Sequence, residues 1–90
     1  MSQFSLGLMY AKGQGTQDYK QAVYWFKKAA KQGDTAAQLN LGFMYDKGHG
    51  VTQDYKEAVY WYEKAARQGD AAARFNLRLI HDKAQGIAQN

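Results

Sequence analysis

The sequence has neither cysteine nor proline among its 90 residues. Without cysteine the chain can form no disulfide, no thiolate zinc site and no cysteine nucleophile, and it is compatible with a reducing compartment. Without proline, the residue that most often interrupts helices is missing, so an all-helical fold is the simplest prediction. A chain of this length supports one small core, and we expect its stability to be modest.

Long apolar runs and clustered charges are also missing. No stretch approaches the roughly 20 apolar residues that cross a bilayer, and the N-terminal MSQFSLGLMY lacks the basic start and apolar core of a signal peptide. We therefore expect no membrane insertion and a cytoplasmic chain as written, or a periplasmic one if it is a fragment. The net charge is +4, but basic and acidic residues alternate, which indicates a solvated surface and no nucleic-acid binding.

What the sequence does contain is an internal repeat. The segment 17–47 recurs as 53–83, a period of 36 residues (53 − 17), and both copies hold QDYK, AVYW, QGD and NL. A repeat of this length is typical of solenoids built from pairs of helices. We predict a single domain over residues 1–90, with units at about 1–33, 34–69 and 70–90, the last of them partial.

Each unit is predicted to hold two helices, A and B. In the complete unit helix A covers about residues 34–47, with Asp34 as N-cap and Gly48 as a left-handed C-terminal cap. Helix B covers about residues 54–68, with Asp54 as N-cap. The links between B and the next A are so short that the two helices must be antiparallel. The predicted order is A-B-A-B-A, five helices.

Further local signals refine these helices. Glu57 follows Asp54 by three residues, which predicts a capping box, and Asp18 is expected to be the N-cap of the first helix B. Trp25 and Trp61 are expected in the core. Within helix A the inward positions are Ala37, Leu41, Met44 and Tyr45, and the opposite arc holds Leu39, Asn40, Phe43, Asp46 and Lys47. Gly42 predicts a close contact between helices, since glycine costs about 1 kcal/mol of helix propensity.

Thirteen residues carry a resemblance to a known family: Ala37, Leu41, Gly42, Tyr45, Gly48, Gly50, Val51, Asp54, Ala58, Trp61, Ala65, Ala66 and Gly69. At these positions the sequence resembles the Sel1-like repeat family, which is related to the tetratricopeptide repeats. The resemblance implies an all-α fold, a right-handed α-α superhelix of about two and a half helix-turn-helix repeats whose A helices line a concave surface. It also implies a non-enzymatic adaptor or scaffold, in a family that includes bacterial proteins.

The last unit departs from this pattern. Arg78 stands in place of Gly42, His81 in place of Tyr45, and the chain stops before a third helix B. The terminal unit of a solenoid needs a polar outer face, which Arg78 and His81 supply. An unpaired last helix could also be covered by a second copy, so a homo-oligomer through the C-terminal helix is one expectation.

Helix A holds the candidate partner-binding residues. Leu8, Phe43 and Leu79 occupy equivalent positions and form a predicted row on the concave face, which would bind a peptide or protein. Packing between repeats explains the same row equally well. The polar residues beside the row are Asn40 and Asn76, with Lys12, Lys47 and Lys83 along its rim.

No residue pattern indicates chemistry, so we expect no enzyme, no cofactor and no metal. The loops GQG and GHG do not follow strands and are explained as helix caps, His49 and His81 have no ligand partners at a repeated spacing, and Glu63 is placed to pair with Arg67. Two alternatives to an adaptor stay open: an inhibitor or immunity protein that blocks a toxin or enzyme, and an excised or designed repeat segment.

Overall fold

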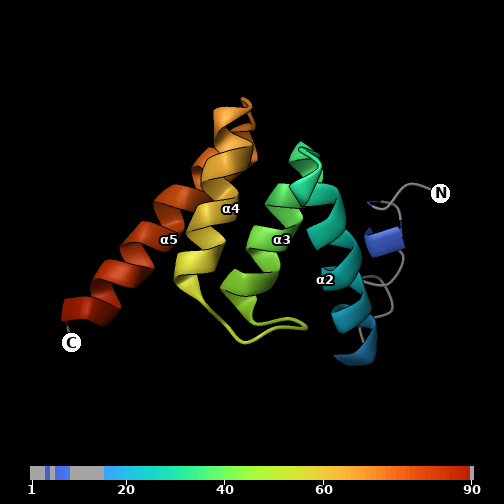
Figure 1. Ribbon diagram of the computed structural model, residues 1–90. Coiled ribbons are helices and arrows are strands. Elements are labelled where there is room, and N and C mark those ends of the chain that lie inside the picture. Colours follow the sequence, from blue (N-terminus) through green and yellow to red (C-terminus); the bar gives the residue numbers. More distant parts are fainter. Residues whose placement is uncertain (1–3, 5, 9–15, 90) are drawn as a thin grey trace.

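The computed structural model describes residues 4, 6–8 and 16–89, and within these residues it contains helices and no strand (Figure 1). Residues 4 and 6–8 are helical. The predicted all-α fold is confirmed. Four longer helices follow: α2 (Thr16–Lys31), α3 (Thr35–Lys47), α4 (Tyr55–Arg67) and α5 (Ala71–Gln89).

The ends of α3 lie where the local sequence signals predicted them. The Asp34 carboxylate accepts a hydrogen bond of 3.1 Å from the Ala37 N–H, which satisfies one of the unpaired donors at the start of the helix. At the other end Gly48 has a φ of 72°, and its N–H donates to the Met44 carbonyl at 2.8 Å. Glycine adopts this left-handed conformation without the penalty that a Cβ brings.

The predicted starts of the two B helices need correction. The Asp54 carboxylate does cap α4, because it accepts from the N–H groups of Lys56 and Glu57. The reciprocal half of the capping box is wrong: the Asp54 N–H donates to the Tyr45 carbonyl at 3.0 Å, and Glu57 is exposed. Asp18 is not the N-cap of α2, which begins at Thr16. It lies in the first turn, where the helix dipole also favours a negative charge.

Helix α5 is longer than its counterpart α3. At its start the Asp70 carboxylate accepts a 2.9 Å hydrogen bond from the Ala73 N–H. The equivalent of the α3 end is Lys83, but α5 continues to Gln89. Ala84 replaces Gly48 at this point, and an alanine disfavours the left-handed cap that ends α3.

The helices pack in chain order as a short solenoid. Consecutive helices are in contact, and α3 also contacts α5, which lies one repeat further on. Figure 1 shows α2, α3, α4 and α5 following one another across the molecule. The tight links after α2 and α4 turn at Gly33 and Gly69, with φ values of 95° and 96°. These links make sequential helices antiparallel, as predicted.

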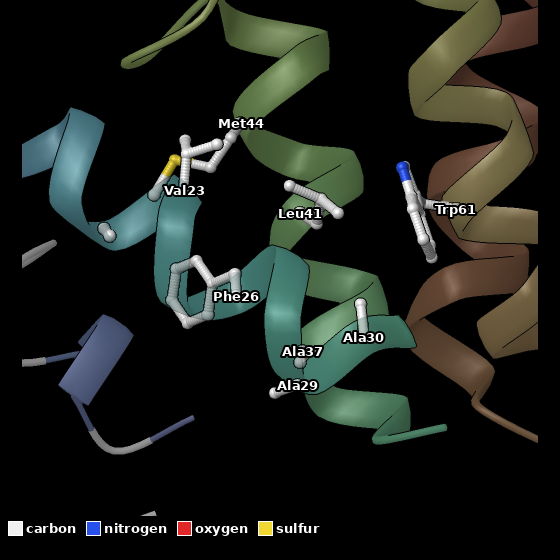
Figure 2. Packing of buried hydrophobic residues seen from close by; sticks show 9 residues of the cluster. Val23, Phe26, Ala29, Ala30, Ala37, Leu41, Met44 and Trp61 are labelled. Atoms are coloured by element: carbon white, nitrogen blue, oxygen red, sulfur yellow. The ribbon is translucent and has the colours of Figure 1, made fainter. Parts of the chain in front are cut away.

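The core repeats with the helices. The first cluster joins α2 and α3 through Val23, Phe26, Leu41 and Met44, and it includes Trp61 from α4 (Figure 2). Ala37, Leu41 and Met44 are buried and Tyr45 is half-buried, which confirms the inward face predicted for helix A. The second cluster joins α4 and α5 around Ala58, Tyr62 and Ile80.

The prediction for the two tryptophans is only half correct. Trp61 is buried, whereas Trp25 is half-buried. Trp61 packs against residues of α2 and α3, the two helices that precede it. Trp25 is not a member of the buried clusters formed by the described residues.

Candidate protein-interaction surface

The outer face of the A helices carries large apolar side chains in contact with solvent. Phe43 of α3 is 41% exposed, and Leu79, its equivalent on α5, is 43% exposed. Leu8 is half-buried and packs against the first core cluster. Lys12 lies outside the described residues. Two of the three positions of the predicted row are therefore exposed, and the third contributes to the core.

Phe43 is the centre of a small cluster that combines rings and a cation. The Lys47 Nζ lies 5.9 Å from the Phe43 ring centroid, and the His49 ring meets Phe43 edge-on with 6.0 Å between centroids. His49 also stacks on Tyr19 of α2 at 4.6 Å. The exposed ring thus has a cation on one side and a titratable ring on the other.

Sequence reasoning considered His49 only as a metal ligand and missed its place beside Phe43. The loop after α3 returns across the start of α2 because Gly48 and Gly50 both have positive φ. A Cβ on Gly50 would lie 2.5 Å from the Tyr19 carbonyl oxygen, so only glycine allows this approach. The repeated G-x-G spacing was the signal that could have placed His49 against the neighbouring helix.

The two asparagines beside the row are half-buried, and one is engaged within its own helix. The Asn40 Nδ2 donates to the Ala36 carbonyl at 2.8 Å. Asn76 occupies the equivalent position on α5. The Asn40 side chain is therefore held close to the surface of α3, with its Nδ2 engaged in this bond.

Lys83 joins two repeats. Its Nζ lies 3.7 Å from the Asp46 Oδ1, which connects α5 to α3. Asp46 was predicted on the exposed arc of helix A, and this is wrong: it is 8% exposed. Burial raises the pKa of the nearby Tyr62 phenol, and the negative charge of Asp46 raises it further. Asp46 is buried beside the neutral Tyr62 phenol, and the Lys83 ammonium compensates the negative charge of its carboxylate.

Leu39 is the second residue of the exposed arc that needs correction. It is half-buried and packs against the clusters formed by α4 and α5. Gln38 is also buried, and its Nε2 donates to the Ala30 carbonyl at 3.1 Å. The prediction assumed one buried face, but α3 contacts α2, α4 and α5, so burial extends further around the helix.

A second exposed aromatic pattern lies on the B helices. Tyr24 is 50% exposed and Tyr60 is 49% exposed. Each meets the following tryptophan edge-on, and a lysine one turn later, Lys28 or Lys64, lies over the tyrosine ring at 4.7 and 5.1 Å. These contacts repeat with the period of the sequence and cover the aromatic rings with lysine side chains.

The described part of the chain contains no group of three or more side chains that could hold a metal ion. Glu63 and Arg67 form the predicted ion pair along α4 at 4.0 Å. Gly48 of the GHG loop caps α3, whereas the GQG loop lies outside the described residues. Among the helices of the described residues, none has the length and apolar character that crossing a membrane requires.

The repeat, its caps and its packing are those of a known family. The Sel1 repeat model matches residues 1–34 and 35–70. The chain belongs to the Sel1 repeat family. Proteins of this family are generally protein-interaction modules and typically non-enzymatic scaffolds.

Similar proteins come from bacteria and a virus. A Sel1 repeat protein from Oxalobacter formigenes is 44% identical, with a TM-score of 0.78 over 84% of this chain and 58% of that one. A protective antigen of uropathogenic Escherichia coli with an SLR fold is 36% identical, with a TM-score of 0.83 over 92% of this chain and 18% of the antigen. A sel1-like repeat-containing protein of Acanthamoeba polyphaga mimivirus is 39% identical over 51 residues, which are 56% of this chain and 10% of that protein. The chain thus spans only part of each of these proteins.

Proposed function

We propose that this chain is a protein-interaction module that binds a peptide or protein partner through the outer face of its A helices, the face with Phe43 and Leu79 that is predicted to line the concave surface. The observation that carries the proposal is the exposure of Phe43 and Leu79, which occupy equivalent positions on α3 and α5. Large apolar side chains exposed at a repeated position on neighbouring A helices give a partner more than one apolar point of contact. They are suited to be apolar anchors for a partner.

The polar neighbours of these anchors indicate what the partner offers. Lys47 is exposed one turn after Phe43, and Asn40 lies one turn before it. A partner helix or strand that places an apolar side chain on Phe43 could give a carboxylate to Lys47 and a donor to the Asn40 amide oxygen. Apolar contact would supply affinity, and the polar groups would fix the register.

The proposal is tested by capture of partners from a lysate with two immobilised double variants and the unchanged chain. Phe43→Ala with Leu79→Ala should remove most of the specifically bound protein, because truncating a hot-spot residue typically costs more than about 1 kcal/mol. Tyr24→Ala with Tyr60→Ala removes an equally exposed aromatic pair from the B helices and should leave the bound proteins unchanged.

Thermal unfolding of the same variants separates binding from stability. The Phe43→Ala, Leu79→Ala variant should keep its helix content and its melting temperature within a few degrees, because both side chains are about two-fifths exposed. A large loss of melting temperature would show that the row is part of the core. Unchanged capture by this variant would place the binding surface elsewhere on the molecule.

A further inference from the structure

A groove between α4 and α5 lies on a different face of α5 from Leu79. Along α4 the residues Tyr55, Val59 and Ala66 follow the spacing of one helix face. Leu77 and His81 of α5, one turn apart, lie opposite them. These residues line two hollows of about 390 Å³ and 320 Å³, one toward each end of the helix pair.

The molecule already contains a filled version of this groove. One period earlier, Val23 and Leu41 stand at the positions of Val59 and Leu77. They are 7% and 0% exposed and share a core cluster with Trp61 of α4, whereas Val59 and Leu77 are only half-buried. Figure 2 shows Trp61 directed from its helix toward Leu41.

The precedent also shows how the groove holds an aromatic ring. Trp61 is 6% exposed, and its buried Nε1 has no hydrogen-bond partner. Apolar contact, and not a directional bond, therefore keeps the indole in place. The open groove between α4 and α5 offers the same aliphatic floor, Val59 and Leu77, to any large aromatic side chain.

A helix cannot fill the open groove in the way that α4 fills the first one. Helix α4 approaches α3 at Gly42, where an added Cβ would lie only 2.7 Å from the Tyr62 ring. The equivalent residue on α5 is Arg78, which is exposed. An arginine side chain is far larger than the hydrogen atom of Gly42, so a helix packed at this point would lie farther from α5 than α4 lies from α3. An extended segment needs only enough space to insert one side chain.

The charges around the groove indicate which residues of a bound segment should flank the inserted side chain. Three exposed cations line it, Lys56, Arg67 and Arg74, and Arg78 is exposed on α5 beside Leu77. Glu63 also lines the groove, and it pairs with Arg67 at 4.0 Å. Asp82 is exposed one turn after Arg78 on the same face of α5. The rim is therefore mainly positive and complements an acidic ligand.

From this precedent, the Arg78 position and the charges, we infer that the groove between α4 and α5 binds an extended acidic peptide segment through one tryptophan or other large aromatic side chain. The aromatic ring lies on Val59 and Leu77, and the flanking carboxylates meet Arg74 and Arg78. This surface is separate from the outer face of the A helices around Phe43, so the inference stands independently of the proposed function.

The test uses a fluorescein-labelled heptapeptide with a central tryptophan and glutamate at every other position. Fluorescence anisotropy should show saturable binding that weakens about tenfold when the peptide tryptophan becomes alanine. Arg74→Glu should weaken binding about tenfold as well, because it reverses a charge at the groove. Lys28→Glu makes the same charge change on α2 and should alter binding less than about twofold.

Methyl resonances locate the peptide. Those of Val59 and Leu77 should shift on titration, and that of Val23 should not, because Val23 is only 7% exposed within the first core cluster. Phe43→Ala should leave peptide binding unchanged, which separates this site from the proposed one. The inference is overturned by absence of saturable binding, by equal affinity for the alanine peptide, by an equal loss in Lys28→Glu, or by light scattering that shows a dimer whose contact occupies the groove.

Discussion

At the scale of single residues, the distance between α3 and α4 depends on one absent side chain. Gly42 faces the Tyr62 ring and the Ala58 carbonyl, and a Cβ there would lie 2.7 Å and 3.2 Å from them. Gly7 faces the Phe26 ring at the same 2.7 Å, so the contact recurs in the first repeat. The free-energy cost of a glycine within a helix is offset by the close packing of a buried aromatic ring that it allows.

Gly42→Ala should therefore destabilise the protein although alanine is the better helix former. Alanine gains about 1 kcal/mol of propensity, but moving Tyr62 or the α4 backbone is expected to cost more than this gain, with a net loss of about 1 to 2 kcal/mol. Thermal denaturation followed by circular dichroism measures it. Arg78→Ala, at the equivalent exposed position of α5, is the control and should change the melting temperature little. A more stable Gly42→Ala would contradict the packing argument.

Residues differ in how far the sequence alone could predict their capping roles, burial and contacts. Asp34 and Gly48 were predictable because their bonds reach only a few residues along the chain. The burial of Asp46 was not, since it depends on Lys83 from another repeat and on Tyr62 from another helix. The exposure of Phe43 follows from helical periodicity, but its contact with His49 depends on a loop path that periodicity does not describe.

At the scale of elements, each helix is defined by its ends. The N-terminus of α4 is held by two contacts of Asp54: its carboxylate accepts from two N–H groups, and its own N–H donates to Tyr45 at the end region of α3. The second contact replaces the capping box and fixes the α4 start to the preceding helix. The sequence predicted the cap because Asp is a common N-cap, but it could not show which acceptor the Asp54 N–H finds.

At the start of α4, substitution of Asp54 should therefore cost more stability than substitution of Glu57. Asp54→Ala removes the acceptor of the Lys56 and Glu57 N–H groups and should lower the free energy of unfolding by about 1 kcal/mol. Glu57→Ala should cost only a few tenths of a kcal/mol, through the loss of a first-turn negative charge. Urea denaturation of both variants checks the difference. Equal losses would mean that the Glu57 side chain does cap the helix in solution.

At the scale of the whole molecule, stability depends on contacts between neighbouring repeats, because each helix contacts the helices next to it and α3 also contacts α5, one repeat further on. Two features connect α4 to the preceding helices, α2 and α3. Trp61 enters the cluster of α2 and α3, and the Gln68 Nε2 donates to the Gly33 carbonyl and to the Gln38 Oε1 at 3.2 Å and 2.8 Å. On α5, Arg74 and Arg78 stand in place of Gln38 and Gly42 of α3. A helix packed on α5 would therefore lack the Gln38 contact and the close approach at Gly42.

The two tryptophans should therefore contribute unequally although they occupy the same position of the repeat. Trp61→Ala leaves a cavity between repeats and should cost about 3 to 5 kcal/mol, a large share of the total stability of a small domain. Trp25→Ala should cost clearly less, since Trp25 is half-buried and does not belong to the buried cluster that holds Trp61. Urea denaturation measures both losses.

Because the chain has two tryptophans, each variant also keeps one as a fluorescent reporter. The reporter in Trp25→Ala should be the more shielded from quenchers until unfolding. Similar losses for the two variants would mean that the groove between α2 and α3 does not hold the repeats together, and the groove between α4 and α5 would then lose its precedent as an aromatic site.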